Sequence, residues 1–202
     1  MAVTLRPPVL YRDGSYDGTD MGVIYECRND EQSRQFSRDK KPIAWDTHKQ
    51  WFGRTMRDRP DSLWMGDVDS ISVGYARQDE RARNRSLISV ALLPAFRRKG
   101  FGVELIEAVT AKIVTAGRIP TAHILPGNAV SVEAFITAGF LPVKMLDGEF
   151  GFESRIWVYE WKSNGRRFSG VPVARQSTAP SKQKPGQAGI IRRAFNYVLG
   201  VE

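Results

Sequence analysis

The sequence has few of the residues that disulfides and metal sites require. Its 202 residues contain a single cysteine, Cys27, and two histidines, His48 and His123. One cysteine cannot form an internal disulfide, which fits a reducing compartment. A zinc site needs three or four nitrogen or sulfur ligands close together, so we expect no metal centre. Other polar side chains and backbone groups are therefore the candidates for function.

Long apolar runs are also missing. A membrane-spanning helix needs about 20 consecutive apolar residues, and no stretch of this sequence reaches that length. No signal-peptide pattern opens the chain. With 42% hydrophobic and 26% charged residues, the composition is that of an ordinary folded domain. We expect no membrane contact and a cytoplasmic location.

Acidic residues are nearly absent from the C-terminal part of the chain. Residues 162–202 contain eight lysines and arginines but a single acid, Glu202, so they carry +7 of the net charge of +8. The body of the chain is therefore nearly neutral. Residues 163–188 are rich in glycine, serine, proline and glutamine, a composition typical of linkers and disordered segments. Beyond them, one helical face collects four apolar side chains: Ile191, Phe195, Val198 and Leu199.

These shifts in composition predict three parts. Residues 1–161 form the folded domain, residues 162–188 form a flexible basic linker, and residues 189–202 form an amphipathic docking helix. A helix this short is marginal alone in water, so we expect it to dock on a protein partner or on a second copy of the chain. The basic tail also predicts weak, non-specific and salt-sensitive contact with nucleic acid.

The folded part is organised around residues 87–103, LISVALLPAFRRKGFGV. The stretch begins as an apolar run typical of a buried strand, and Pro94 ends it because proline cannot donate to a ladder. Apolar residues at helical spacing begin at Val103. A basic loop with Gly100 and Gly102 therefore joins a strand to the N-terminus of a helix. Unpaired N–H groups at such a terminus bind anions, and glycine lets the backbone approach a phosphate closely.

Helical and strand patterns alternate along the rest of the folded part. An early hairpin-like region and a late strand–helix–strand crossover predict a mixed α/β (α+β) sheet. The expected strands are 3–5, 9–11, 63–65, 71–77, 87–93, 123–125, 140–145 and 154–161. The expected helices include 21–27, a helix to about 56 with Asp46 as its N-cap, one over 103–114, and one capped by Asn128 and stopped by Gly139. Turns are expected at 66–69 and 79–85.

The loop pattern is R-x-x-G-x-G, on Arg97, Gly100 and Gly102. It lacks the G-K-[ST] of a Walker loop and the G-x-G-x-x-G of a dinucleotide fingerprint. It resembles the acetyl-coenzyme A (acetyl-CoA) loop of the GNAT N-acetyltransferase superfamily, whose amides hold the cofactor's pyrophosphate. An ordinary basic strand-to-helix turn is the alternative. The resemblance implies cofactor contacts along the strand end and loop: Leu92, Leu93, Arg97, Arg98, Lys99, Gly100, Phe101, Gly102 and Val103.

A second segment, residues 128–140, reads NAVSVEAFITAGF. It resembles the GNAT segment in which an asparagine opens a helix and Gly-Phe ends it. The resemblance implies that Asn128, Ser131 and Phe135 lie along the pantetheine arm and sulfur of acetyl-CoA. Many members carry a tyrosine where this chain has Phe135, and that tyrosine donates a proton to the departing thiolate. Phenylalanine has no such proton, so Ser131, another group or water must supply it, or catalysis is weak.

A third set of residues lies upstream, in two predicted helices. It is similar to a pattern in the GNAT branch of ribosomal-protein and amino-sugar-nucleotide acetyltransferases. The resemblance implies that these helices form the wall on the acceptor side, with Arg28, Asn29 and Trp51 as substrate contacts. Plain core packing is the alternative for Trp51. The matching residues are Arg28, Asn29, Arg34, Ser37, Pro42, Ile43, His48, Trp51 and Phe52.

The catalytic base is not evident from the sequence. His48 and Ser131 are the weak candidates for catalysis, and a structural or surface role for His48 is favoured. The leading interpretation is an N-acetyltransferase that moves an acetyl group from acetyl-CoA to a primary amine, on a protein N-terminus, a lysine or an amino sugar. The alternative is a weak or inactive GNAT-fold subunit of a larger assembly, such as a phage particle, docked through its tail and located within a virion.

Overall fold

The computed structural model describes residues 2–9, 18–147 and 155–163. The predicted linker (162–188), apart from its first two residues, and the docking helix (189–202) lie outside the described residues. So does most of the predicted strand 9–11. None of the described helices is long and apolar enough to cross a bilayer.

A seven-stranded sheet runs through the described part of the chain in the order β1-β2-β3-β4-β5-β7-β6. Neighbouring strands are antiparallel except β4 and β5, which are parallel. The predicted mixed α/β fold is therefore confirmed. The strands are β1 Thr4–Arg6, β2 Leu63–Val68, β3 Ile71–Arg81, β4 Arg85–Leu92, β5 Ile119–Ile124, β6 Phe140–Leu146 and β7 Ile156–Trp161. The helices are α1 Gly18–Asn29, α2 Glu31–Gln35, α3 Trp45–Asp58, α4 Phe101–Thr115 and α5 Ala129–Thr137, with single 3₁₀ turns at Pro60–Ser62 and Pro94–Phe96.

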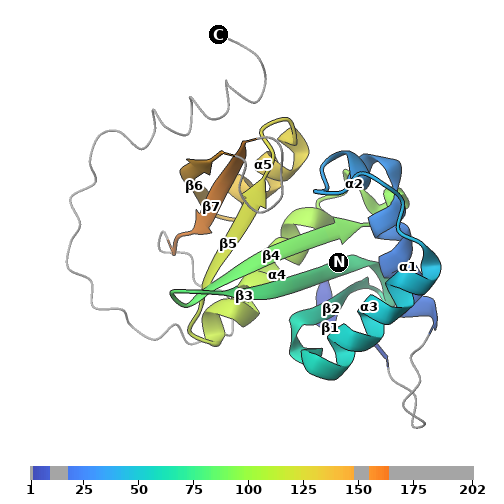
Figure 1. Cartoon of the computed structure of the whole chain (residues 1–202). Coiled ribbons are helices and arrows are strands. Elements are labelled where there is room, and N and C mark those ends of the chain that lie inside the picture. The colour runs from blue at the N-terminus through green and yellow to red at the C-terminus, as the bar shows by residue number, and fades with distance from the viewer. Residues whose placement is uncertain (1, 10–17, 148–154, 164–202) are drawn as a thin grey trace, which may run out of the picture.

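Two clusters of buried side chains hold helices to the sheet. The larger cluster joins α4 and α5 to the strands and includes Ile106, Val109 and Phe140. The smaller one packs α1 and α3 on the opposite face of β2–β4 and includes Phe52 and Tyr75. Figure 1 shows α1, α2 and α3 gathered at the β1–β4 side, with α4 crossing the other face of the sheet. Only the β1–β4 half of the sheet therefore has helices on both faces in the described structure.

An arginine network fixes the start of α1 against the sheet edge. Arg6 of β1 donates to both carboxylate oxygens of Asp20, at 2.6 and 2.8 Å, and to Asp67 of β2 at 2.6 Å. Asp20 is buried, so its charge needs these partners. The network fastens the first turn of α1 to β1 and β2.

Three sequence-based expectations about turns and caps are wrong. The turn expected at 66–69 is confined to Asp69 and Ser70, because residues 66–68 remain buried and paired with β3. The turn expected at 79–85 is shorter, because β3 continues to Arg81 and its end pairs with Arg85. Asp46 is not an N-cap, since α3 begins one residue earlier at Trp45 with Ala44 in the cap position.

Candidate active site where two parallel strands part

The central feature of the site is the divergence of β4 and β5. The two strands pair only at one end: Arg85 with Ile119, Ser86 with Pro120, and Leu87 with Thr121. Beyond Leu87, β4 continues to Leu92 alongside β3 alone, and Figure 1 shows the two strands moving apart. In the part of the chain that the structure describes, backbone groups on this side of β4 have no strand partner. They are available to bind a ligand.

The closed end of this divergence is held by side chains. Arg118 donates from Nη2 to the Arg85 carbonyl at 2.7 Å and from Nε to Ser86 Oγ at 2.8 Å. Thr121 Oγ1 donates to the Ser86 carbonyl at 3.2 Å, and Arg85 pairs with Glu160 of β7 at 2.9 Å. Ser86 and Thr121 are buried. The strands are thus fixed where they meet and open where they part.

The glycine loop stands at the open end of β4. Gly100 has a left-handed backbone, with φ of +86°, and a Cβ built there meets nothing within 4 Å. Its carbonyl accepts hydrogen bonds from Val103 N and Glu104 N, at 3.0 and 3.3 Å, which starts α4. The N–H groups of Phe101 and Gly102 fall in the first turn, where no intrahelical partner exists. An open backbone surface with free donors and the positive end of α4 is suited to an anion.

Arg97, the first residue of the motif, turns away from this surface. Its guanidinium donates to the Leu92 carbonyl at 3.1 and 3.2 Å, to Asp30 Oδ2 at 2.7 Å, to Ser33 Oγ at 3.2 Å and to Gln32 Oε1 at 3.0 Å. Burial disfavours the Asp30 carboxylate, but the bonds from Arg97 and Ser33 outweigh burial and hold the pKa of Asp30 below its usual range. Arg97 therefore ties the loop to the corner between α1 and α2.

The two remaining loop cations are Arg98 and Lys99. Both are exposed, and Lys99 Nζ lies 5.6 Å from the Phe96 ring centroid. Because Arg97 is engaged elsewhere, Arg98 and Lys99 supply the positive charge of the loop. Of the other predicted contacts, Leu92 packs with the α4 cluster together with Phe101 and Val103, while Leu93 packs with the α1–α3 cluster.

The segment after β5 forms as its sequence predicts. Asn128 caps α5, its Oδ1 accepting from Ser131 N at 3.2 Å, and Gly139 ends the helix with φ of +94°. Ser131 is half-buried in the first turn. Phe135 lies in the core, its ring edge-on to Phe140 with centroids 5.0 Å apart. An aromatic pair occupies this position, and it holds no proton donor.

Of the residues expected on the acceptor side, Asn29 and His48 have structural partners. Asn29 exchanges two hydrogen bonds with the backbone of Ile43, at 2.7 and 2.9 Å, and so fastens the end of α1 to the segment before α3. His48 is 1% exposed, its Nε2 is 3.0 Å from the Met21 carbonyl, and the ring of Trp51 lies beside it. Burial lowers the pKa of His48. These positions favour packing roles for both residues.

Arg28 and Trp51 do meet, as two parts of one surface. The Arg28 guanidinium lies 4.7 Å from the Trp51 ring centroid, and Arg77 of β3 lies 6.0 Å from the same centroid. Arg77 was not expected from the sequence. The alternation of β3, with Tyr75, Arg77 and Asp79 on one face, is the signal that could have placed it there.

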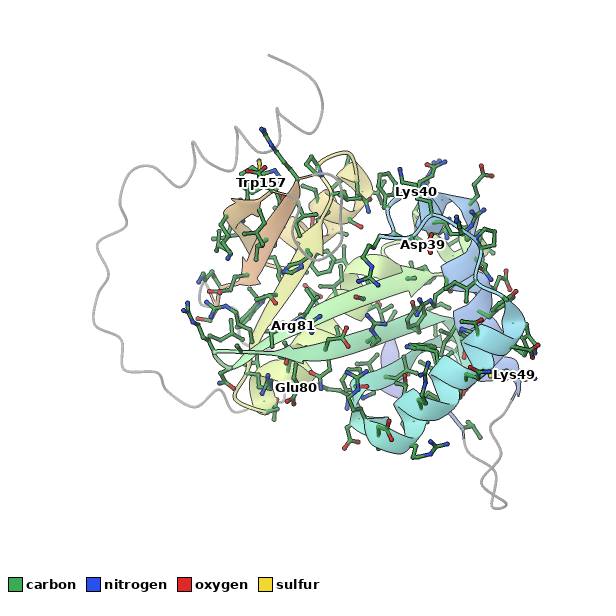
Figure 2. The ribbon with its side chains drawn as sticks, in the orientation of Figure 1. Asp39, Lys40, Lys49, Glu80, Arg81 and Trp157 are labelled. Carbon is green, nitrogen blue, oxygen red and sulfur yellow. The ribbon has the colours of Figure 1, made fainter. Side chains whose placement is uncertain are left out.

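The acidic residues near the site are poor candidates for a free base. Asp79 is held by Arg77 at 2.8 Å and Arg59 at 3.2 Å. Burial disfavours ionised Glu160, but Lys162 and Arg85 outweigh it and keep the pKa of Glu160 below its usual range. Glu80 lies at the hairpin end of β3, next to Arg81 in Figure 2.

His123 of β5 is a residue that sequence reasoning missed as a site candidate. Ala122 and Ile124 point into the core with α4 and α5, so His123 faces the opposite side of the sheet. It follows the last β4–β5 pair by two residues. Burial, with the charges of Arg81 and Lys144, lowers the pKa of His123. A neutral imidazole therefore borders the divergence at physiological pH.

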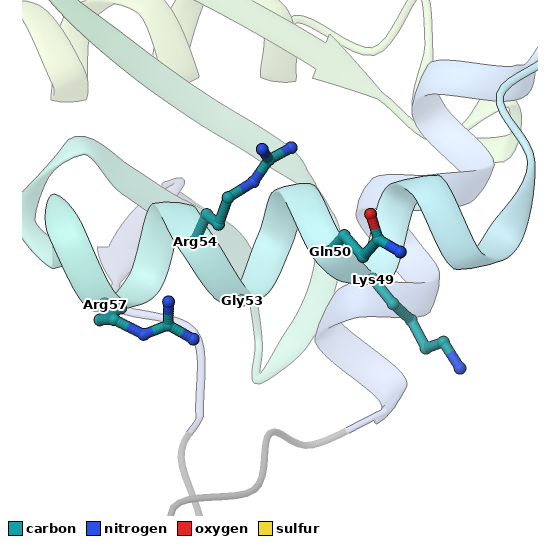
Figure 3. Close-up of a pocket in the computed structure, with 5 residues that line it drawn as sticks. All are labelled: Lys49, Gln50, Gly53, Arg54 and Arg57. Carbon is teal, nitrogen blue, oxygen red and sulfur yellow. The ribbon is translucent and has the colours of Figure 1, made fainter.

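A separate hollow lies on the outer face of α3 (Figure 3). It is lined by Lys49, Gln50, Gly53, Arg54 and Arg57, all from this one helix. Lys49 projects outward from α3 in Figure 2 and pairs with Asp46 at 3.0 Å. Because no residue of the loop or of β4 lines it, this hollow is distinct from the site described above.

Several solved structures of N-acetyltransferases have a similar architecture. A ribosomal-protein-alanine N-acetyltransferase from Brucella melitensis aligns with a TM-score of 0.62 at 19% identity, over 78% of this chain and 98% of that one. A spermidine N-acetyltransferase from Vibrio cholerae, in complex with CoA and spermine, aligns with a TM-score of 0.64 at 17% identity, over 79% and 94%. The putative acetyltransferase YncA from Salmonella typhimurium, solved with acetyl-CoA, aligns with a TM-score of 0.61 at 18% identity, over 82% and 96%.

The protein therefore has the fold of the GNAT N-acetyltransferases, and the resemblance inferred from its loop is confirmed at that level. Within this class, residues 76–144 match the family model described as FR47-like protein. The matched segment runs from β3 through the glycine loop, α4 and α5 into β6. No curated protein matches the sequence.

Proposed function

We propose that the protein is an acetyl-CoA-dependent N-acetyltransferase acting on a primary amine. The observation that carries this proposal is the glycine loop at the N-terminus of α4, beside the divergence of β4 and β5. Support also comes from the similar folds solved with CoA or acetyl-CoA. A phosphate-binding backbone next to an unpaired strand edge suits a long cofactor with a pyrophosphate at one end and a thioester at the other.

The residues at the site fit such a cofactor. The amides of Phe101 and Gly102 would hold the pyrophosphate, and the exposed Arg98 and Lys99 would add charge. A side chain at Gly100 would stand on the open surface that the phosphates must approach. Leu92, Leu93, Val103, Asn128 and Ser131 would contact the pantetheine arm.

When bound, acetyl-CoA supplies a thioester whose carbonyl carbon accepts the amine nitrogen. The nitrogen–carbon bond forms, the carbon–sulfur bond breaks, the nitrogen loses a proton and the sulfur gains one. Unpaired N–H groups near the end of β4 would donate to the carbonyl oxygen as negative charge develops there. We propose His123 as the group that takes the amine proton, because its lowered pKa keeps it neutral.

Protonation of the departing thiolate falls to Ser131 or to water. Phe135 cannot donate, and its ring is packed against Phe140. Ser131 lies in the first turn of α5 and would be near a sulfur bound beside Asn128, and a thiolate is a tolerable leaving group. We expect the chemistry to proceed without the tyrosine found in many GNAT enzymes.

The absence of a tyrosine at position 135 favours a second candidate function, a weak or inactive GNAT-fold adaptor. This adaptor would dock through residues 189–202 or bind nucleic acid weakly through its basic tail. This candidate shares the fold and differs in activity. It predicts cofactor binding without turnover, which separates it from the first proposal.

The test is release of free CoA thiol from acetyl-CoA over a panel of primary amines: peptide N-termini, lysine, polyamines and amino sugars. The proposal expects release that depends on one class of amine and that slows by about 100-fold when His123 is changed to alanine. Acetyl-CoA binding without release for any class supports the adaptor instead. Failure to bind any acyl-CoA overturns both.

A further inference from the structure

Arg28 carries a charge that the described protein does not balance. It lies in the last turn of α1, half-buried, with its guanidinium over the Trp51 ring at 4.7 Å. Among the described residues no carboxylate lies within 4.0 Å of it, whereas Arg77 and Arg97 each have such a partner. Half-buried guanidinium groups are normally paired. Arg28 is therefore a cation in need of an anion.

Two neighbouring arginines, Arg77 and Arg59, add to the excess of positive charge around Arg28. Asp79 serves two arginines at once, Arg77 at 2.8 Å and Arg59 at 3.2 Å. The Nε of Arg77 is buried and has no hydrogen-bond partner among the described residues. With Arg28, this corner holds three guanidinium groups and one carboxylate.

The buried side chain of Tyr75 lies close enough to both Arg28 and Arg77 for their charges to affect its pKa. Burial raises the pKa of Tyr75, and the charges of Arg28 and Arg77 act against that rise. Both arginines therefore lie near Tyr75 of β3 as well as near the Trp51 ring. The two cations are therefore neighbours around the Trp51 ring.

The group of Arg28, Arg77 and Trp51 borders the proposed reaction centre. In the β3–β4 register, Arg77 pairs with Ser89 and Tyr75 with Ala91. Ser89 and Ala91 lie on β4 beyond Leu87, where β4 has left β5. The last turn of α1, which carries Arg28, is also tied to the cofactor loop through the Asp30–Arg97 pair. The cations thus line the acceptor side of the divergence.

We infer that the acceptor amine carries an oxyanion, a carboxylate or a phosphate, which binds between Arg28 and Arg77 beside Trp51. This inference rests on the proposed function and names the substrate class of its site. The planar fork of a guanidinium matches either oxyanion in a bidentate geometry, and partial burial strengthens the attraction. Arg57, which is exposed on the outer face of α3 (Figure 3), serves as the control.

The experiment compares matched amines that differ only in the anion. The pairs are an α-amino acid and its amide, O-phosphoethanolamine and ethanolamine, and glucosamine 6-phosphate and glucosamine. Thiol release from acetyl-CoA gives kcat/KM for each. The wild type should favour the anionic member of at least one pair by about 10-fold or more, the worth of one charge-assisted hydrogen-bonded contact. Whether the preference appears in the amino-acid pair or in a phosphate pair shows whether the site binds a carboxylate or a phosphate.

Variants then locate the preference. Arg28→Gln should bring the ratio within the pair close to one, mainly by raising KM for the anionic amine. Arg28→Lys should restore part of the preference, because the charge returns without the fork. Arg57→Gln, on the outer face of α3, should keep the wild-type ratio. An unchanged ratio in Arg28→Gln, or a preference for the neutral amine in every pair, overturns the inference.

A binding measurement separates this inference from the proposed function. If no amine is acetylated, the proposed activity fails, and the melting temperature of the CoA-loaded protein is then measured with each pair. Greater stabilisation by the anionic member in wild type than in Arg28→Gln still supports the oxyanion site. Equal shifts in both proteins contradict it.

Discussion

The proposed cofactor side and the proposed acceptor side of the site are built in different ways. The cofactor side is contiguous, running from the end of β4 through the glycine loop into α4, and it offers mostly backbone groups. The acceptor side gathers side chains from α1, α3 and β3, with Arg28, Trp51 and Arg77 as its centre. A backbone site depends on local conformation, whereas a side-chain site depends on register and packing. The two halves should therefore fail separately when mutated.

The largest expected effect breaks the cofactor half alone. Gly100→Val puts a β-branched residue at φ of +86° on the open face of the loop, and we expect acetyl-CoA affinity to fall about 100-fold, or roughly 2.8 kcal/mol. Calorimetric titration measures this.

Gly117 is the matched control, since it has φ of +72° and equally open space around its Cβ, at the end of α4 remote from the loop. Gly117→Val should lower the melting temperature as much as Gly100→Val does and leave the affinity unchanged. Equal losses of affinity in the two variants would show that backbone strain, and not phosphate approach, is what matters.

The next effect concerns the base. His123→Gln should lower kcat by about 100-fold, the usual worth of a positioned base, with little change in acetyl-CoA affinity. Because the pKa of His123 is lowered, the acid limb of the kcat profile should fall below the ordinary histidine value of about 6.5. An acid limb that persists in His123→Gln assigns the proton to another group.

A smaller effect tests the link between the halves. Arg97→Ala should weaken acetyl-CoA binding about 10-fold by freeing the loop, with the salt dependence of Kd unchanged, because Arg97 contacts Asp30 and not phosphate. Arg98→Ala and Lys99→Ala should instead flatten the salt dependence. Asp30→Asn should reproduce most of the Arg97→Ala effect and add little to it in the double variant. A flattened salt dependence in Arg97→Ala contradicts this role.

The pH dependence of folding gives a further contrast. Burial lowers the pKa of both His48 and His123 in the folded state. The unfolded chain then binds more protons as pH falls through about 6.5, so the free energy of unfolding should decrease below that pH. Urea titrations from pH 8 to pH 5 measure it. His48→Gln should reduce the slope, and a slope unaffected by that change contradicts the burial of His48.

The smallest effect concerns the thiolate. Phe135→Tyr should change kcat by less than about threefold or raise it, because Ser131 or water already supplies the proton. The added hydroxyl enters the contact with Phe140, so stability should fall by about 1 kcal/mol. A large loss of rate with folding intact would mean that the apolar ring itself is required at the sulfur.

Local signals explain what the sequence could predict. Gly100, Asn128 and Gly139 each act within one turn of chain, so the loop, the cap of α5 and its end all follow from residue type. The tight turns were misplaced because Asp69–Ser70 and Arg83–Asn84 adopt positive φ without glycine. Such turns are normally marked by Asn-Gly or Asp-Gly.

The acceptor side could not be predicted in the same way. Arg77 enters the site through the register of β3 with β4, and His123 through the loss of pairing between β4 and β5. Arg97 is the first residue of the loop motif, yet its partners Asp30 and Ser33 lie more than sixty residues away in sequence. Long-range packing decides all three, and no local pattern reports it.

The most direct test of the central claim is the amide chemical-shift map of the protein on addition of CoA. The account predicts the largest shifts at Phe101 and Gly102, where α4 begins, and at Ile88 and Val90, whose N–H groups face the open side of β4. Shifts confined to the outer face of α3 or to the basic tail, or no shifts at saturating CoA, would contradict it.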